Sequence, residues 1–530
     1  MKKRSLMFFL VLVMVLSLLS GCKSNNTNTQ TGSSERTGDR RIAYYAFNSE
    51  PYIDLDPSVE YSNGLIVLHN VYETLTRYDH KEEIVKPLLA ESWTSNDDGT
   101  KWTFHIREGV KFHDGADLDA EAVKKSIDRT IEMKMGASFI WDSVESINVV
   151  DKYTIEFVLK YPAPIDLIAS SSYAAFIISP NAVENDSQWF NDGNCAGTGP
   201  YKIQKITKGE EVILEKFDDY WQGWKDNQYT NVIIKKVAES SARRQLLETG
   251  EAQIAAAFSV TDLQALREKN DLEVVDAATW RNVIGFFNTE KEPLNNVDFR
   301  RALAYAFPYD ETITEIKEGL AVQSYGLIPK GLWGHDESLP QYECDLDKAK
   351  EYLEKSGVDT NGLKLEMTFT AGTEAYRNFA QLYKINLQKL GIELEIREMS
   401  WDNVWEKSKN TNPEDRQDIL VMNWWPDYAS PLSWVQSLVQ SEESILFNLS
   451  YIKDDNLDKM VADVERYTAT DRDKAQELII DIQREVIDKA YFLHIYDDMT
   501  SWVIDKNFKG FESNPAYEYV VFFYDTYFEE

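Results

Sequence analysis

The pattern of apolar and polar residues predicts strands and short helices in the N-terminal half of the chain. Residues 101–106 and 154–159 are strand-like runs bounded by turn residues. Between them, from 120 to 131, apolar residues recur at helical spacing. Three further elements are expected in this half, namely strands at 211–215 and 232–237 and a helix at 242–248 that Gly250 would end.

The C-terminal half has a more regular pattern. Its expected elements are a strand at 363–369, a helix at 374–390 that Gly391 would end, a strand at 392–397, a helix at 401–408 and a strand at 418–422. This β-α-β-α-β order predicts a mostly parallel sheet with right-handed crossovers. Because ligands bind beyond the carboxyl ends of strands in such sheets, we expect ligand contacts just after Met422.

The segment that follows Met422 is dense in aromatic and polar residues. Residues 423–431 read Asn-Trp-Trp-Pro-Asp-Tyr-Ala-Ser-Pro, and Ser430 with Pro431 is predicted to begin a helix at 432–440. Ser430 would then cap the helix and leave the Asp427 carboxylate uncommitted in the loop. Such a carboxylate suits a cationic ligand group, in a contact of about 1.5 to 3 kcal/mol. The alternative is a turn aspartate bonded to nearby backbone amides.

Tryptophan is concentrated in the same region. Five residues lie within a stretch of 34, although the whole chain has only 14 among 530, and they are Trp401, Trp405, Trp424, Trp425 and Trp434. Indole rings can stack on sugars, pack over peptide side chains or fill a core. Core filling can hardly apply to both Trp424 and Trp425, because consecutive residues leaving a strand point to opposite sides.

The N-terminus has the pattern of a signal peptide. Basic residues at positions 2–4 precede an uncharged apolar run at 6–19, which is shorter than the roughly 20 residues of a membrane-spanning helix. No other stretch is long and apolar enough to span a membrane. The run ends in Leu19-Ser20-Gly21-Cys22, which resembles the lipobox of bacterial lipoproteins. That resemblance implies removal of residues 1–21 and a lipid on Cys22, with an incidental cysteine as the alternative.

Composition narrows the possible functions. Residues 22–39 are polar and are expected to form the lipidated cysteine and a flexible tether. Without residues 1–21 the chain has 509 residues, and its formal charge changes from −33 to −36. This charge repels nucleic acid phosphates and anionic lipid.

Cys195 and Cys344 are too few for a disulfide framework. They could pair, but each is interpreted as a small buried residue.

Motifs for catalysis, cofactors and metals are absent from the sequence. It has no Gly-x-Ser-x-Gly, His-Glu-x-x-His, Walker-type or Cys-x-x-Cys motif. The six histidines are scattered, so no metal site or cofactor is expected.

Several phrases resemble the family 5 extracellular solute-binding proteins, which include the oligopeptide-, dipeptide- and nickel-binding receptors of ABC importers. They are 70–75 (NVYETL), 87–93 (PLLAESW), 104–115 (FHIREGVKFHDG), 197–201 (GTGPY), 220–223 (YWQG), 300–306 (RRALAYA), 348–353 (KAKEYL) and 424–431 (WWPDYASP). The phrase at 107–115 is the most specific of them.

The resemblance implies an α/β fold with two periplasmic-binding-protein-like lobes and an inserted α+β domain. Lobe I would combine 40–76, 196–288 and 500–530, the inserted domain would be 77–195, and lobe II would be 289–499. The lobes would close over the ligand by a hinge motion.

The resemblance also implies a function and a site. In peptide-binding members the Asp of a Trp-x-x-Asp-Tyr phrase pairs with the ligand's N-terminus, and here that residue is Asp427. The phrase departs from the family at Trp425 and Pro426, because the family often has smaller residues at these two positions. The candidate ligand contacts are Asp427, Trp425, Trp424, Asn423, Tyr428 and Trp401.

The expected protein is therefore a monomeric, lipid-anchored receptor on the outer face of the cell membrane, or facing the periplasm if the envelope has two membranes. It would capture oligopeptides and deliver them to an ABC permease and its ATPase. Alternatives are an oligosaccharide receptor of the same fold, a nickel or metal-chelate receptor, an exported hydrolase, and a sensor or adhesin without a transport partner.

Overall fold

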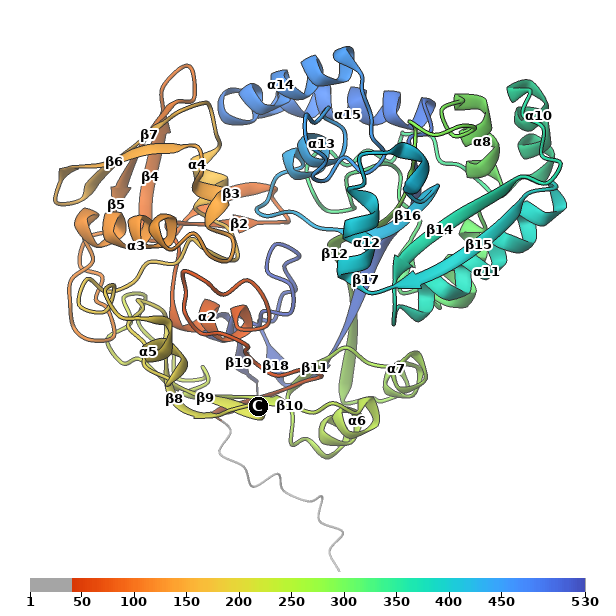
Figure 1. Cartoon of the computed structure of the whole chain (residues 1–530). Coiled ribbons are helices and arrows are strands. Elements are labelled where there is room, and N and C mark those ends of the chain that lie inside the picture. The colour runs from red at the N-terminus through yellow and green to blue at the C-terminus, as the bar shows by residue number, and fades with distance from the viewer. Residues whose placement is uncertain (1–40, 530) are drawn as a thin grey trace, which may run out of the picture. The chain divides into compact units, whose positions relative to one another are not determined.

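The structure is a computed structural model that describes residues 41–529 (Figure 1). The expected signal peptide, the tether and Cys22 lie outside the described residues. Both strands and helices are well represented, which confirms the predicted α/β class.

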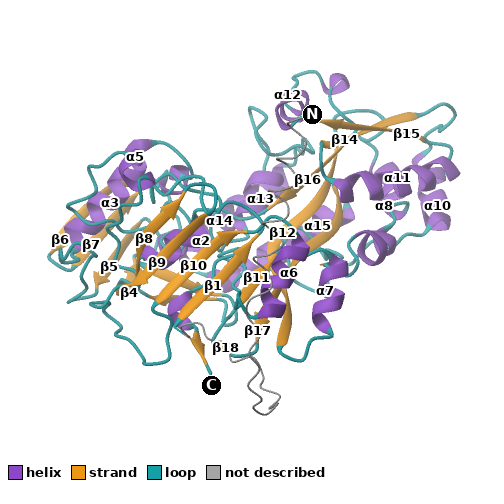
Figure 2. Cartoon of the chain, turned by 90° about the horizontal axis from the view of Figure 1, so that it is seen from below, coloured by secondary structure: helices purple, strands orange, loops and turns teal. Residues whose placement is uncertain are grey.

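One large sheet contains strands from both ends of the chain. Its strands are β1 (Ile42–Phe47), β8 (Tyr201–Thr207), β9 (Glu211–Lys216), β10 (Asn231–Lys236), β11 (Ile254–Ala256), β12 (Leu272–Phe287), β13 (Ala321–Val322), β14 (Lys364–Thr370), β15 (Glu393–Met399), β16 (Ile419–Trp424) and β17 (Phe492–Asp505). The order is β15-β14-β16-β12-β17-β11-β1-β10-β9-β8, with β13 on β17. Figure 2 shows β8, β9, β10 and β1 side by side.

The C-terminal part of this sheet follows the predicted order. Strand β14 pairs in parallel with both β15 and β16. The ends of all three strands agree with the prediction to within one or two residues. Helix α11 (Glu374–Lys389) lies between β14 and β15 in the chain, and Gly391 follows it with a φ of 81°, a conformation that suits glycine. The parallel β-α-β-α-β unit is therefore confirmed.

Two long strands join this parallel unit to the rest of the large sheet. Strands β12 and β17 pair antiparallel from Leu272 with Asp505 to Phe286 with Phe492, and β12 also pairs with β16. Their pairing is irregular between Ala278 and Asn282. There, β12 has three residues where β17 has only Asp498, so the strand bulges.

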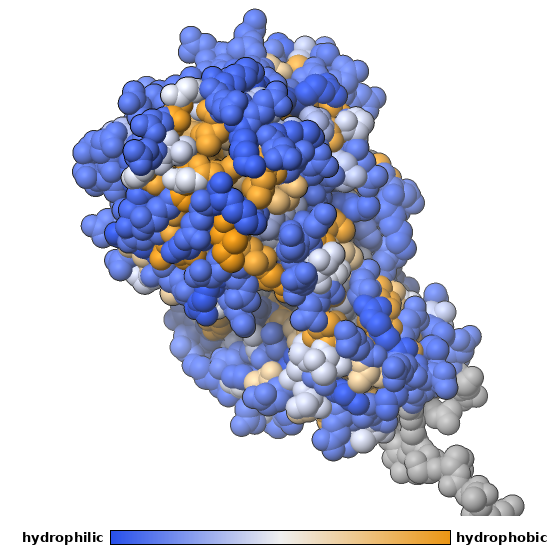
Figure 3. Space-filling model, turned by 90° about the vertical axis from the view of Figure 1, so that its right-hand side faces the viewer, coloured by the Kyte–Doolittle hydropathy of each residue, from blue (hydrophilic) through white to orange (hydrophobic). Residues whose placement is uncertain are grey.

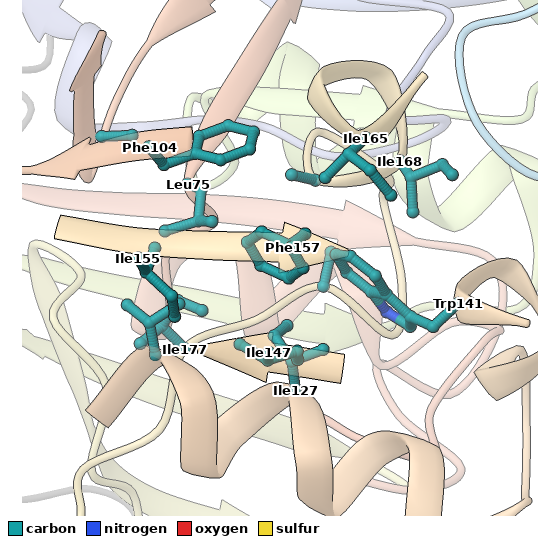
Figure 4. Packing of buried hydrophobic residues seen from close by; sticks show 14 of the residues in the cluster. Leu75, Phe104, Ile127, Trp141, Ile147, Ile155, Phe157, Ile165, Ile168 and Ile177 are labelled. Atoms are coloured by element: carbon teal, nitrogen blue, oxygen red, sulfur yellow. The ribbon is translucent and has the colours of Figure 1, made fainter. Parts of the chain in front are cut away.

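A separate four-stranded antiparallel sheet has the order β4-β5-β7-β6. Its strands are β4 (Ala90–Ser95), β5 (Lys101–Ile106), β6 (Val144–Asp151) and β7 (Thr154–Leu159). Helix α3 (Ala120–Met133) begins where the Asp119 side chain accepts a hydrogen bond from the Ala122 amide at 2.9 Å. The core beside it contains Phe157, which contacts Phe104 edge-on and stacks with Trp141 (Figure 4).

The remaining elements are mostly helices. They are α2 (Leu65–Val71), α4 (Ile165–Ile168), α5 (Ser187–Asn191), α6 (Ser240–Thr249), α7 (Val260–Arg267), α8 (Val297–Tyr305), α9 (Tyr309–Glu311), α10 (Leu346–Ser356), α12 (Trp401–Ser408), α13 (Leu432–Leu438), α14 (Asp455–Thr470) and α15 (Arg472–Asp488), with the short strand pairs β2 (Thr76–Asp79) with β3 (Ile84–Pro87) and β18 (Phe508–Lys509) with β19 (Tyr527–Phe528). Hydrophilic residues cover most of the face in Figure 3, as the acidic composition leads one to expect.

The two cysteines of the described region do not form a disulfide. Cys195 is half-buried, and its Sγ accepts a hydrogen bond from the Ile203 amide at 3.3 Å. Cys344 is exposed, so the prediction that it is a buried core residue is wrong.

Candidate functional site

A large cavity opens at the carboxyl end of β16. Its volume is about 930 Å³, within the range typical of small-molecule sites. One wall comes from residues 139–168, around the four-stranded sheet. The opposite wall comes from the ends of β14 and β16, the loop after β16, and helices α12, α13 and α14. We call this space the large chamber.

All six residues predicted from the sequence line the large chamber. They are Trp401, Asn423, Trp424, Trp425, Asp427 and Tyr428. The prediction that ligand-facing residues follow the last parallel strand therefore agrees with the position of the chamber. That position does not test their binding roles, which stay predictions.

Aromatic rings form much of the chamber wall. Trp401 stacks on Trp405 with ring centroids 5.3 Å apart, and Phe447 contacts both Trp405 and Trp424. Trp425 is 52% exposed and Trp401 47% exposed, which is unusual for such large apolar side chains. These two rings are therefore available for contacts with a ligand.

Not every tryptophan of the cluster belongs to the wall. Trp434 is fully buried on α13, and its Nε1 donates to the Asn282 side chain on β12 at 3.1 Å. Trp333 Nε1 donates to the Ala429 carbonyl at 2.9 Å. These bonds attach α13 and the loop to the core, so Trp434 is a core residue.

The start of α13 differs in detail from the prediction. The helix spans Leu432–Leu438, two residues shorter than predicted, and Pro431 is at its N-cap position. The Ser430 hydroxyl still accepts a hydrogen bond from the Leu432 amide, at 3.2 Å. Ser430 thus supports the helix start although it is not the N-cap residue.

The Asp427 carboxylate is not free of protein contacts, contrary to the prediction. The Tyr173 hydroxyl, which lies 3.3 Å from both Asp427 Oδ1 and the Pro426 carbonyl, can donate to either. The Ser171 hydroxyl donates to the Asp427 backbone carbonyl at 2.9 Å. Burial raises the pKa of Asp427 to about 6, against the opposing effect of the hydroxyls of Tyr173 and Ser433.

A second, smaller cavity of about 250 Å³ lies on the other side of the same loop. We call it the small chamber, and Trp425, Asp427 and Tyr428 line both chambers. The bulge in β12 carries Trp280 and Arg281 to its wall. Arg281 and Glu518 in its wall form an ion pair, with Arg281 Nη2 donating to Glu518 Oε2 at 2.7 Å.

Several buried polar atoms around the chambers have no hydrogen-bond partner among the described residues. In the large chamber they include Ser143 Oγ and Trp424 Nε1, and in the small chamber Trp280 Nε1 and Arg281 Nε. Buried polar atoms are usually paired, because an unpaired one costs about 1 to 3 kcal/mol. The chambers are therefore suited to a ligand with polar groups as well as apolar surface.

Sequence reasoning missed the residues that other elements bring to the chambers. Tyr173, Arg281 and Glu465 come from segments far from 423–428 in the chain. One signal was available, since the polar run Ser-Ser-Ser-Tyr at 170–173 interrupts an apolar stretch. Nothing in the sequence marked Arg281 or Glu465.

Residues 41–529 contain no helix with the length and apolarity needed to cross a membrane. Nor do they contain a group of three or more His, Cys, Asp or Glu side chains that could hold a metal ion.

Comparisons with known proteins identify the family. Residues 85–444 match the family model of bacterial extracellular solute-binding proteins, family 5 (middle). The chain belongs to this family. Its members are transport receptors rather than enzymes, so this solute-binding protein is not the exported hydrolase considered among the alternatives.

Relatives and solved structures agree with this assignment. The solute-binding protein is 30% identical over 481 residues to the probable D,D-dipeptide-binding periplasmic protein DdpA of Escherichia coli, covering 88% of this chain and 90% of that one. It superposes on HbpA2 of Haemophilus parasuis with a TM-score of 0.82 at 20% identity, covering 92% and 100%. For DppA of Helicobacter pylori in complex with the peptide STSA, the TM-score is 0.72 at 23% identity, covering 93% and 99%. The predicted periplasmic-binding-protein fold is thereby confirmed.

Proposed function

We propose that this solute-binding protein captures oligopeptides with a free N-terminus and delivers them to an ABC permease and its ATPase. Asp427 would bind the ligand's α-ammonium, and Trp424, Trp425 and Trp401 would pack against the peptide. The peptide-binding names of relatives support the ligand class.

The observation that carries the proposal is the Asp427 carboxylate in an aromatic chamber. None of the described residues that line the large chamber is Lys, Arg or His. A carboxylate removed from water without a cationic partner is costly, and a ligand ammonium would remove that cost. Exposed indole rings beside it would cover apolar parts of a peptide.

The test is calorimetric titration of peptides into ligand-free protein. We expect a peptide with a free N-terminus to bind wild type about tenfold to 150-fold more tightly than its Nα-acetylated form, as a contact of about 1.5 to 3 kcal/mol implies. Asp427→Asn should abolish this difference. Equal binding of both forms by wild type would refute the proposed role of Asp427.

An oligosaccharide is the second candidate, and the aromatic wall supports it. The stacked pair Trp401 and Trp405 and the exposed Trp425 offer planes of the kind that sugar rings cover. A thermal-shift screen of peptides and oligosaccharides separates the two, since a ligand at 100 times its Kd stabilises by about 2.7 kcal/mol. A neutral sugar should bind Asp427→Asn almost as well as wild type.

We also propose that a lipid on Cys22 holds the receptor at the membrane, with residues 23–39 as a tether. Two acyl chains would give a stable anchor, since each buried CH₂ contributes about 0.8 kcal/mol. In the native host, Cys22→Ser should release the protein from the membrane fraction. Mass spectrometry of the N-terminal peptide should find diacylglycerol on Cys22 in wild type, and its absence would refute the anchor.

A further inference from the structure

The large chamber contains a second carboxylate that the proposed function does not use. Glu465 lies on α14, which follows the β16 loop in the chain, and its side chain lines the large chamber. It is half-buried, and burial raises the pKa of its carboxyl group. Among residues 41–529 the Glu465 carboxylate has no hydrogen bond or ion pair.

The surroundings of Glu465 are aromatic. The pKa of the Tyr161 and Tyr428 phenols is raised mainly by burial, then by the charge of Asp142 or Asp427 respectively, and the charge of Glu465 raises both further. Both rings line the large chamber. A cation placed beside such a carboxylate would also lie near the faces of aromatic rings, which attract positive charge.

Ser143 gives independent support for a polar ligand group in this chamber. It is only 3% exposed, it lines the chamber, and its Oγ has no hydrogen-bond partner among the described residues. A hydroxyl oxygen can accept a hydrogen bond from an ammonium or guanidinium group.

The charges around both chambers are unbalanced. The acidic residues in their walls are Asp427, Glu465 and Glu518, whereas the only basic one among the described lining residues is Arg281. Arg281 is already paired with Glu518 at 2.7 Å. Two carboxylates, Asp427 and Glu465, are thus left facing the large chamber without a cationic partner from the described protein.

From these observations we propose that Glu465 forms a second cation subsite, which selects ligands that carry a basic group in addition to the ammonium bound by Asp427. The preferred ligands are peptides with a lysine or arginine side chain. This inference rests on the proposed function, because it assumes that a peptide N-terminus occupies the Asp427 end of the same chamber.

The test compares peptides that differ only in the side-chain charge. Ala-Lys-Ala and Ala-Ala-Lys are titrated against the same peptides with norleucine in place of lysine. Wild type should bind at least one lysine peptide about tenfold or more tightly than its norleucine partner, the ratio expected for one charge-assisted contact. Glu465→Gln should reduce that ratio to near one.

Asp463→Asn is the matched control. Asp463 lies on the same helix, pairs with Arg466 at 2.9 Å and is not among the chamber residues. This variant removes the same charge from α14 but should keep the preference for lysine. Absence of any lysine preference in wild type, or the same preference in Glu465→Gln, would overturn the subsite.

Failure of the proposed function would give a different result. If no peptide binds, cadaverine and pentylamine are compared by thermal shift with wild type and Glu465→Gln. If cadaverine stabilises wild type more than pentylamine does, and this difference depends on Glu465, the result would support the subsite although the peptide proposal had failed. Equal shifts with the two amines would overturn the subsite as well.

Discussion

Replacing Asp427 by Asn should stabilise the ligand-free receptor while it weakens peptide binding. In the folded protein the pKa of Asp427 is raised to about 6, from a value near 3.8 in the unfolded chain. Between these two values the folded state holds more protons than the unfolded state, so stability falls as the pH rises through this window. Above about pH 6 the ionised carboxylate lowers the stability of the folded state by its full amount. An uncharged asparagine side chain does not cause this loss.

The size of the effect follows from the two pKa values. Their difference of about 2.2 corresponds to about 3 kcal/mol, which is an upper limit because the side chain is partly exposed. For the 489 described residues the unfolding entropy is about 1 kcal/mol per kelvin, so the largest expected increase in Tm is about 3 °C. The Asn side-chain oxygen can still accept a hydrogen bond from Tyr173.

Differential scanning fluorimetry of both proteins, stripped of ligand, measures this effect. We expect Asp427→Asn to have the higher Tm at about pH 7.5, and the two proteins to differ little at about pH 4, where the carboxyl group is protonated in the folded state and most of the cost of its burial is absent. A lower Tm for the variant at about pH 7.5, or the same difference at both pH values, would refute the argument that burial makes this carboxylate costly.

Three further variants test how the fold holds the site. Arg129 forms two hydrogen bonds to the fully buried Asp56, at 2.6 and 2.7 Å, so Arg129→Gln should leave an uncompensated buried charge and lower the free energy of unfolding in urea by about 3 to 5 kcal/mol. Gly197→Ala would place Cβ 2.0 Å from a carbonyl oxygen of α2, and the resulting strain should cost about 1 to 3 kcal/mol in the same assay. Trp434→Phe should cost about 1 to 3 kcal/mol, because Asn282 loses a buried donor, and an unchanged midpoint would contradict the anchoring role of this bond.

The local elements could be predicted because their signals lie close together in the chain. Helix α12 has the predicted bounds, and α11 ends within one residue of its prediction, before Gly391. The parallel arrangement of β14, β15 and β16 follows from their alternation with helices. The environment of Cys344 could not be predicted in this way, because burial depends on which distant segments pack nearby.

For the candidate site, the sequence alone predicted which loop lines the large chamber, since residues that leave a parallel strand lie at the edge where ligands bind. Asp427 and the indole rings of 424–425 were found from this rule. Only the tertiary structure decided what faces them, because Tyr173, Arg281 and Glu465 reach the chambers from segments between 38 and 254 residues away from Asp427. The balance of charge in a cavity depends on all of its walls, and one loop supplies only one of them.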